Sequence, residues 1–311
     1  MSVPENNSLD YARSEPAIHQ SPPASFPSSM GLLIFINVLW GASSAATKYG
    51  LTAFGPCTLA MLRFIPAGLL LYALCHKQRL LVPIRRPDRF PLFLLAFVGI
   101  TLTYGVLYNG IARTTATDAA LLVACEPLLI ALVAMLFLHE RLRAEQWLGL
   151  FIGLVGVRLI AGSGVGNWIA LLGLAFECST SVIAKELTGR YPGLVIVSYE
   201  LLFGGLLLLP VSLWEIASHP PVITLAALVG WAYLTLVCTA FCYGIWYCLL
   251  ERFPISAMGV FILIQPLSGP VYGWLLRGEA LQHNSALGGT LVIVGILLTT
   301  FFYKNQPGKK S

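Results

Sequence analysis

Charged residues are scarce in this sequence, in which Asp, Glu, Lys and Arg together make up 11% of the chain. Soluble globular proteins carry about 25% charged residues. Hydrophobic residues reach 57%, more than one water-soluble core would bury. The composition therefore excludes an ordinary soluble domain and indicates a membrane protein. The net charge of +5 does not indicate nucleic-acid binding, because the basic residues are spread over short connections between apolar runs.

Motifs for metal-dependent and ATP-dependent chemistry are missing as well. His139-Glu140 is not followed by the second His of an HExxH motif, and the chain has no GxxxxGK[ST] phosphate loop. The longest connection, near residues 77–90, is too short to hold a soluble catalytic domain. Seven cysteines, an odd number, are scattered through apolar runs, so we interpret them as small core residues. We expect no cofactor, no metal site and no enzymatic activity.

The apolar residues form ten runs of roughly membrane-spanning length. We predict an all-α membrane protein with ten transmembrane helices near residues 31–50, 56–76, 91–112, 117–138, 145–161, 167–188, 193–214, 223–250, 255–276 and 284–303. Residues 1–29 are polar and proline-containing, which predicts a disordered cytoplasmic tail and not a signal peptide. Residues 304–311 are predicted to be a second cytoplasmic tail.

Lysine and arginine are concentrated in alternate connections, which sets the expected orientation. They favour the connections after runs two, four, six and eight and the C-terminal tail, with Arg113 and Arg277 as the exceptions. The pattern predicts that both termini are cytoplasmic and that the protein lies in the cell inner (plasma) membrane.

The two halves of the chain are related by an internal repeat. An offset of 139 aligns Tyr104-Gly105 with Tyr243-Gly244, Tyr108 with Tyr247, Glu126-Pro127 with Gln265-Pro266, Glu140 with Glu279, Gly149 with Gly288 and Gly156 with Gly295. An offset of 137 aligns Lys48 with Lys185, Arg63 with Glu200 and Gly68 with Gly205. Five helices per half would make the repeats inverted, an arrangement typical of secondary transporters. We assign residues 30–161 to the first repeat and 165–303 to the second.

The sequence resembles a known family in both halves. VLWGASSAATKYG, EPLLIALVAMLFLHERL and QWLGLFIGLVGV are similar to the EamA domain of the drug/metabolite transporter superfamily. QPLSGPVYGWLLRGEAL and ALGGTLVIVGI repeat the signature more loosely, and the resemblance covers residues 31–303. It implies a ten-helix carrier of a kind that often exports amino acids or related metabolites. Gln265 stands where the family often has Glu.

Polar residues at membrane depth are the candidate site. Glu126 lies near the middle of the run 117–138, where a lipid-facing carboxylate would cost at least ~2.5 kcal/mol. It could bind a cationic group or a proton, or hydrogen-bond backbone freed by Pro127. Gln265 suits a zwitterionic or amide-bearing substrate, or satisfies the backbone at Pro266.

Arg63 and Glu200 also fall within hydrocarbon depth, so they should face protein or water. They could bind the carboxylate and amine of a substrate, or pair with other helices, and Glu177 has the same status. Lys48 and Lys185 end their runs, where we expect them to extend to the interface and suit the helix dipole. A gating ion pair is the alternative.

Aromatic residues could line a cavity for an organic substrate. Tyr104 and Tyr243 repeat at matching positions, and Trp40 joins them as a candidate for cation–π contact. Tyr108 and Tyr247 lie closer to the predicted helix ends, so we interpret them as interfacial belt aromatics. Glycines in runs five and ten, at Gly149, Gly153, Gly156, Gly288, Gly289 and Gly295, predict close helix packing in a scaffold.

The sequence thus predicts a secondary transporter that exports a small organic metabolite by alternating access. Amino acids and their derivatives, including metal chelators built from them, are the leading substrate class, and protons are a candidate coupling ion. The alternatives are a multidrug or riboflavin-like vitamin carrier, a passive channel and an intramembrane enzyme. No nucleic-acid partner is expected.

Overall fold

All regular secondary structure is helical in the residues that the computed structural model describes, 26–126, 128–129, 144–162, 164–253 and 255–304. The first half contains α1 (Phe26–Gly41), α2 (Ser43–Gly50), α3 (Pro56–Lys77), the 3₁₀ turn η2 (Arg86–Asp88), α4 (Arg89–Ala96), the π-helix η3 (Phe97–Leu102), α5 (Thr103–Ala112), α6 (Ala116–Val123) and α8 (Ala144–Ala161). The second half contains α9 (Val165–Thr188), α10 (Gly193–Leu207), α11 (Leu209–Ser218), α12 (Leu225–Ala232), the π-helix η4 (Tyr233–Tyr243), α13 (Gly244–Arg252), α14 (Ile255–Ile262), α15 (Ile264–Arg277) and α16 (His283–Lys304).

The helices are long and apolar enough to cross a bilayer in five places: Ser29–Gly50, Pro56–Lys77, Arg86–Ala112, Val165–Thr188 and Leu225–Arg252. The α10–α11 pair, bent by 44°, would make a sixth span. The prediction of an all-helical membrane protein is confirmed for the described residues. Helix α1 begins at Phe26, inside the range predicted as a tail. Residues 130–138 of the run 117–138 lie outside the described residues, as does His139-Glu140.

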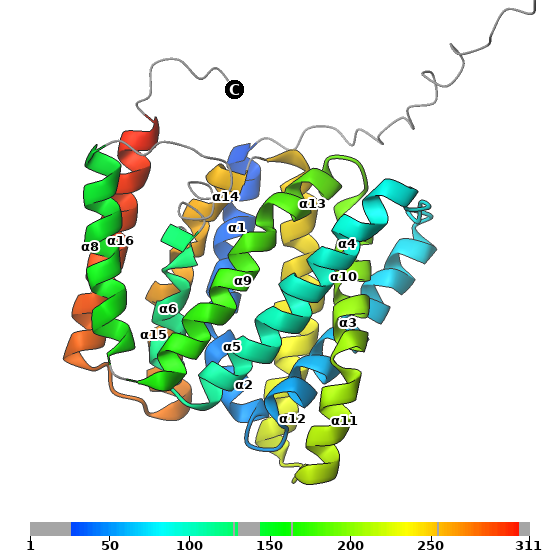
Figure 1. Ribbon diagram of the computed structural model, residues 1–311, viewed down its shortest axis with the longest axis horizontal. Coiled ribbons are helices and arrows are strands. Elements are labelled where there is room, and N and C mark those ends of the chain that lie inside the picture. The colour runs from blue at the N-terminus through cyan, green and yellow to red at the C-terminus, as the bar shows by residue number, and fades with distance from the viewer. Residues whose placement is uncertain (1–25, 127, 130–143, 163, 254, 305–311) are drawn as a thin grey trace, which may run out of the picture.

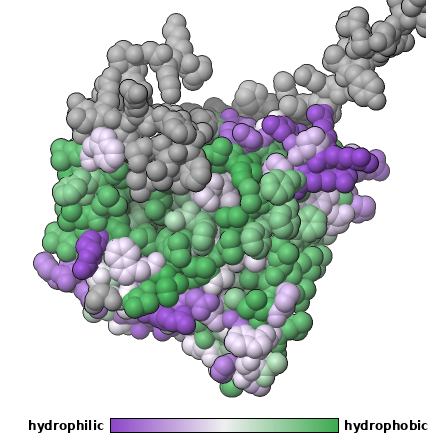
Figure 2. All heavy atoms as spheres, viewed as in Figure 1, coloured by the Kyte–Doolittle hydropathy of each residue, from purple (hydrophilic) through white to green (hydrophobic). Residues whose placement is uncertain are grey.

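The surface has the polarity expected of a membrane protein. Apolar side chains cover the middle of the face in Figure 2, while polar residues gather at the upper right, beside α3 and α4, and along the lower edge. Many large apolar side chains are exposed, among them Phe151, Trp214 and Trp274. Such an apolar surface is too extensive for water and fits a lipid environment.

Helices α8 and α16 lie side by side at one edge of the molecule (Figure 1) and meet through their glycines. A Cβ atom added at Gly156 would come within 2.5 Å of the carbonyl oxygen of Gly288, and one at Gly288 within 2.7 Å of that of Gly156. Gly295 faces the backbone of Gly149 and Gly153 in the same way. The predicted close packing of these helices is confirmed, since small residues let the two backbones touch.

Both halves interrupt their helices at the same place. Helix α6 ends at Val123 and α14 at Ile262, positions 139 residues apart, just before Glu126 and Gln265. After α6, Ala124 and Cys125 donate to the carbonyls of Leu121 and Leu122, the tighter hydrogen bonds of a 3₁₀ turn. Pro127 lies outside the described residues. The interruption in each half brings a polar side chain to the interior.

The π-helices also recur in both halves, because η3 shifted by 139 falls within η4. Threonine hydroxyls fill the widened turns: Thr103 Oγ1 donates to the Val98 carbonyl over 2.8 Å and Thr239 Oγ1 to the Leu234 carbonyl over 2.7 Å. Widened turns of this kind often occur at functional sites. Here η3 leads directly into α5, which carries Tyr104 and Tyr108, and η4 ends at Tyr243 and leads into α13, which carries Tyr247.

A glutamate in the α15–α16 connection fixes the start of α6. Glu279 accepts hydrogen bonds from the backbone amides of Ala116 and Thr117 and from the Thr117 hydroxyl, and pairs with Arg277 Nε at 3.2 Å. Partial burial opposes ionisation of Glu279, but these hydrogen bonds outweigh it and hold the pKa of the carboxyl below its usual value of 4.5. The carboxylate thus stabilises a helix N-terminus from outside that helix.

Candidate functional site

One cavity lies between the two halves of the described structure, with a volume of about 170 Å³. A single water needs ≳10–15 Å³ by this kind of measure, so the cavity has room for a small organic molecule. All the side chains predicted as site residues border it: Trp40, Arg63, Tyr104, Glu126, Glu200, Tyr243 and Gln265. They come from distant parts of the chain, and the fold brings them together.

Arg63 lies in the middle of α3 and is 3% exposed. Its Nε donates to Thr239 Oγ1 over 2.6 Å and its Nη1 to the Tyr108 hydroxyl over 2.5 Å. The guanidinium also stacks on the Phe64 and Tyr104 rings, at 4.9 and 5.1 Å from their centroids. Among the described residues no carboxylate pairs with it, and nothing accepts a hydrogen bond from Nη2. A buried cation with a free donor is suited to bind an anionic group.

Glu200 of α10 occupies the position matching Arg63 in the second half and is 4% exposed. It accepts a hydrogen bond from the Tyr247 hydroxyl. Tyr108 thus hydrogen-bonds a guanidinium group in the first half, and Tyr247 hydrogen-bonds a carboxyl group in the second. The belt interpretation of these two tyrosines is wrong, because both are buried and their hydroxyls bind an interior ionisable group instead of the membrane surface.

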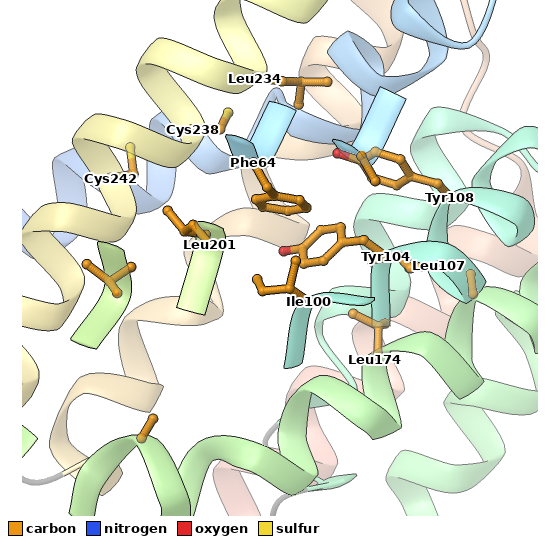
Figure 3. Close-up of a cluster of buried hydrophobic side chains, with 14 of the residues drawn as sticks. Phe64, Ile100, Tyr104, Leu107, Tyr108, Leu174, Leu201, Leu234, Cys238 and Cys242 are labelled. Carbon is orange, nitrogen blue, oxygen red and sulfur yellow. The ribbon is translucent and has the colours of Figure 1, made fainter. Parts of the chain in front are cut away.

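Glu177 of α9 lies beside Tyr104 and Tyr243. Its Oε1 accepts from the Tyr104 hydroxyl over 3.3 Å and from the Tyr243 hydroxyl over 3.0 Å. The two hydroxyls also contact each other. Figure 3 shows Tyr104 between Phe64 and Tyr108, with which it makes edge-on ring contacts.

An aromatic wall closes one side of the cavity. The Trp40 ring meets Tyr243 edge-on at 5.4 Å and Trp246 at 5.6 Å between centroids. Its Nε1 donates to the Cys238 carbonyl over 2.8 Å, which fixes the ring in place. Such a wall can bind apolar or cationic parts of a substrate.

Glu126 and Gln265, the matching residues of the two interruptions, have different surroundings. Gln265 Nε2 donates to Asn37 Oδ1 over 2.9 Å, and Asn37 in turn donates to the Leu33 carbonyl. The amide of Gln265 thus binds a side chain of α1 and not the backbone at Pro266. The Glu126 carboxyl borders the cavity and accepts no hydrogen bond from the described residues.

Lysines bind carbonyls at both ends of the cavity. Lys48 Nζ donates to the carbonyls of Ile111, Ala112 and Thr114, at 3.2, 3.4 and 2.7 Å. Lys185 Nζ donates to those of Leu250 and Phe253. These carbonyls belong to the C-terminal ends of α5 and α13, which lie at opposite ends of the bundle in Figure 1. Each lysine thus caps the C-terminal end of a neighbouring helix, where a cation suits the helix dipole.

Glu177, which the sequence gives the same status as Arg63 and Glu200 because it carries a charge at membrane depth, also borders the cavity. Other residues of the cavity were not among the predicted site residues. The small hydroxyl residues Ser43, Ser44, Thr47, Thr180 and Ser181 also border the cavity. Serine and threonine are ordinary in membrane helices, so sequence offers no means of selecting these.

Comparison with known proteins gives the relationships of the chain. The sequence profile of the EamA-like transporter family matches twice, over residues 28–162 and 164–301. A Chlamydia trachomatis S-adenosylmethionine/S-adenosylhomocysteine transporter is 28% identical over 287 residues, covering 86% of this chain and 87% of that protein. A Streptantibioticus cattleyicolor protein named "probable terminal-alkyne amino-acid exporter" is 27% identical over 278 residues, covering 86% and 91%.

A solved crystal structure is similar in fold. It superposes with a TM-score of 0.61 at 21% sequence identity, covering 89% of this chain and 98% of that chain. At this identity the likeness concerns the fold alone.

Proposed function

The chain belongs to the EamA-like transporter family, and on that premise we propose that it is a secondary carrier that exports a small dipolar metabolite across the inner membrane by alternating access. Family membership makes it a transporter and points away from an enzyme. The proposed cargo is an amino acid or an amino-acid-derived compound, which carries both a carboxylate and an ammonium group.

The observation that carries the proposal is the buried Arg63 with a free Nη2, facing a cavity that also holds Glu126 and Glu177. A buried cation without a carboxylate partner is costly unless an anion completes it. The carboxylate of the substrate would bind Nη2 of Arg63, and its ammonium group would bind Glu126 or Glu177. The names of two relatives, an amino-acid exporter and a transporter of S-adenosylmethionine, agree with cargo of this chemistry.

The proposed architecture has ten spanning helices in two inverted five-helix repeats, residues 30–161 and 165–303, with both termini cytoplasmic. The double match of the family profile supports two repeats. The equivalent helix interruptions before Glu126 and Gln265 support it too. Inverted repeats place the substrate near the midplane, where one half rocks against the other.

The experiment is uptake into proteoliposomes containing the purified full chain. Radiolabelled leucine, phenylalanine and S-adenosylmethionine would be supplied outside, with the same unlabelled compound inside. We expect saturable uptake that is accelerated by internal substrate for at least one of them, and loss of that uptake in Arg63→Gln. Flux that does not saturate would identify a passive channel, and no uptake of any amino-acid compound would contradict the proposal.

The aromatic wall of Trp40, Tyr243 and Trp246 favours one alternative, a carrier of planar aromatic compounds such as riboflavin or a cationic dye. The same vesicles distinguish the two. Competition by excess riboflavin without competition by amino acids would support the alternative, and the reverse pattern would support the amino-acid carrier.

A further inference from the structure

Three oxygen atoms at the centre of the cavity form a closed triangle. Glu177 Oε1 lies 3.3 Å from the Tyr104 hydroxyl and 3.0 Å from the Tyr243 hydroxyl, and the two hydroxyls are within hydrogen-bond distance of each other. The three groups come from α9, α5 and η4. Each pair of atoms in the triangle is thus close enough to share a hydrogen bond.

The number of hydrogens decides the state of this triangle. Each hydrogen bond needs one hydrogen, and each tyrosine hydroxyl supplies only one. Three such bonds would need three hydrogens, one more than the two hydroxyls supply, and a proton on the carboxyl group would provide the third. We propose that Glu177 binds a proton on Oε1 and that this carboxyl, closed by Tyr104 and Tyr243, is the proton site of the carrier.

The other carboxyl groups of the cavity lack this arrangement. Glu200 accepts one hydrogen bond from one hydroxyl, that of Tyr247, so an ionised carboxylate satisfies its geometry. Glu126 accepts none from the described residues. Only at Glu177, among the described carboxyls of the cavity, do two hydroxyls that contact each other also meet one carboxyl oxygen.

Other titratable and charged groups border the same cavity and face this site. They are Arg63, Tyr108, Glu126, Cys178, Glu200 and Tyr247. None of them hydrogen-bonds the Glu177 carboxyl, and Arg63 forms no ion pair with it. The partners of the Glu177 carboxyl are thus the two tyrosine hydroxyls, and no neighbouring cation pairs with it in place of a proton.

Release of the proton changes the connection between the two halves. The O–H bond of Glu177 breaks, the proton passes to water in the cavity, and the carboxylate keeps the electron pair. Two hydrogens then remain, and both hydroxyls donate to the carboxylate, so the bond between Tyr104 and Tyr243 is lost. Because those tyrosines belong to different halves, proton loss removes a link across the cavity. The coupling of this step to cargo movement rests on the proposed carrier function, whereas the proton site does not.

Infrared difference spectroscopy of the purified full chain in lipid nanodiscs tests the site without any substrate. Spectra recorded between pH 6 and pH 9 would show the carbonyl stretch of a protonated carboxyl group. We expect Glu177→Gln to remove one such band, and Glu126→Gln and Glu200→Gln to leave that band in place. If Glu177→Gln removed none of these bands, or if the only bands present were those lost in Glu126→Gln or Glu200→Gln, the proposal would be overturned.

The tyrosines supply a second test that keeps the carboxyl intact. Tyr104→Phe and Tyr243→Phe each remove one corner of the triangle, so each should shift the Glu177 band. Tyr72→Phe, in which the lost hydroxyl has no hydrogen bond in the described structure, should not. An unshifted band in both variants would contradict the triangle, even if Glu177→Gln failed to fold. Failure here leaves the uptake assay untouched, so the two proposals can fail separately.

Discussion

Tyr104 and Tyr243 stand 139 residues apart at matching positions of the two halves, and their hydroxyls are hydrogen-bonded to each other. The contact joins α5 of the first half to η4 of the second. The next tyrosine along each half binds a different group, since Tyr108 accepts from the Arg63 guanidinium and Tyr247 donates to the Glu200 carboxyl. Matching residues thus meet at the centre of the molecule, while their neighbours make the two sides of the cavity chemically different.

Arg63→Lys should weaken cargo binding even though it keeps the positive charge. A lysine cannot bond Thr239 and Tyr108 and still present a further planar donor. We expect at least a tenfold rise in the KM of uptake, ~1.4 kcal/mol. The exposed Arg158, which donates to the Gly162 carbonyl, provides the control Arg158→Lys. An equal KM in Arg63→Lys and the parent protein would remove Arg63 from the binding site.

Tyr247→Phe should lower the stability of the protein. It removes the only hydrogen bond that the described residues give to Glu200, which is 4% exposed. A buried polar group left unpaired costs ~1–3 kcal/mol. Thermal unfolding in detergent measures the change, with Tyr72→Phe as the matched control. Restoration of the melting temperature in the double variant Tyr247→Phe/Glu200→Leu would support this cause, and an unchanged melting temperature in Tyr247→Phe would refute it.

Glu279→Gln should change the response of stability to acid. The pKa of Glu279 lies below its usual value of 4.5, because hydrogen bonds from Thr117, Ala116 and Arg277 outweigh partial burial. The ionised Glu279 carboxylate therefore stabilises the folded protein fully above about pH 4.5, and this stabilisation is lost as the pH falls through the lowered pKa. Melting temperatures between pH 7 and pH 3 should fall more steeply in the parent protein than in Glu279→Gln.

The exposed Glu186 supplies the control for that acid series. Glu186→Gln should keep the acid slope of the parent protein. If Glu279→Gln also kept that slope, the carboxylate at the start of α6 would contribute nothing to stability.

Gly156→Ala should destabilise the α8–α16 pair. The added Cβ would meet the Gly288 carbonyl oxygen at 2.5 Å, a backbone atom that cannot rotate away. Overpacking of this kind costs ~1–3 kcal/mol, against a gain of ~0.5–1 kcal/mol in helix propensity. Gly31→Ala, where nothing lies within 4 Å, should show the gain alone. If Gly156→Ala and Gly31→Ala had the same melting temperature, the two helices would not touch at Gly156.

Polar side chains at membrane depth could be placed in the interior from sequence. Arg63, Glu126, Glu200 and Gln265 all border the cavity, because exposing such groups to lipid is costly. Tyr108 and Tyr247 were misjudged because a tyrosine near a helix end suits both an interface and a buried polar partner. The partner is decided by which helices pack together.

Helix pairing itself is weakly encoded in this kind of sequence. Lipid-facing and interior surfaces are both apolar, so hydrophobic periodicity does not show which face of α5 meets α9. The π-helices η3 and η4 also rotate the following residues relative to a regular helix. The approach of Tyr104 to Glu177 follows from both effects, and sequence spacing alone could not give it.

The ammonium groups of Lys48 and Lys185 donate hydrogen bonds to carbonyls at two helix ends, where water molecules would otherwise donate. In the alternating access that we propose, separation of these helix ends would let water bind the carbonyls that an ammonium group leaves, so no acceptor would stay unpaired. Opening would then exchange one donor for another, and a hydrogen bond contributes only ~0.5–1.5 kcal/mol net. The lysines would therefore add little to the cost of opening at either end.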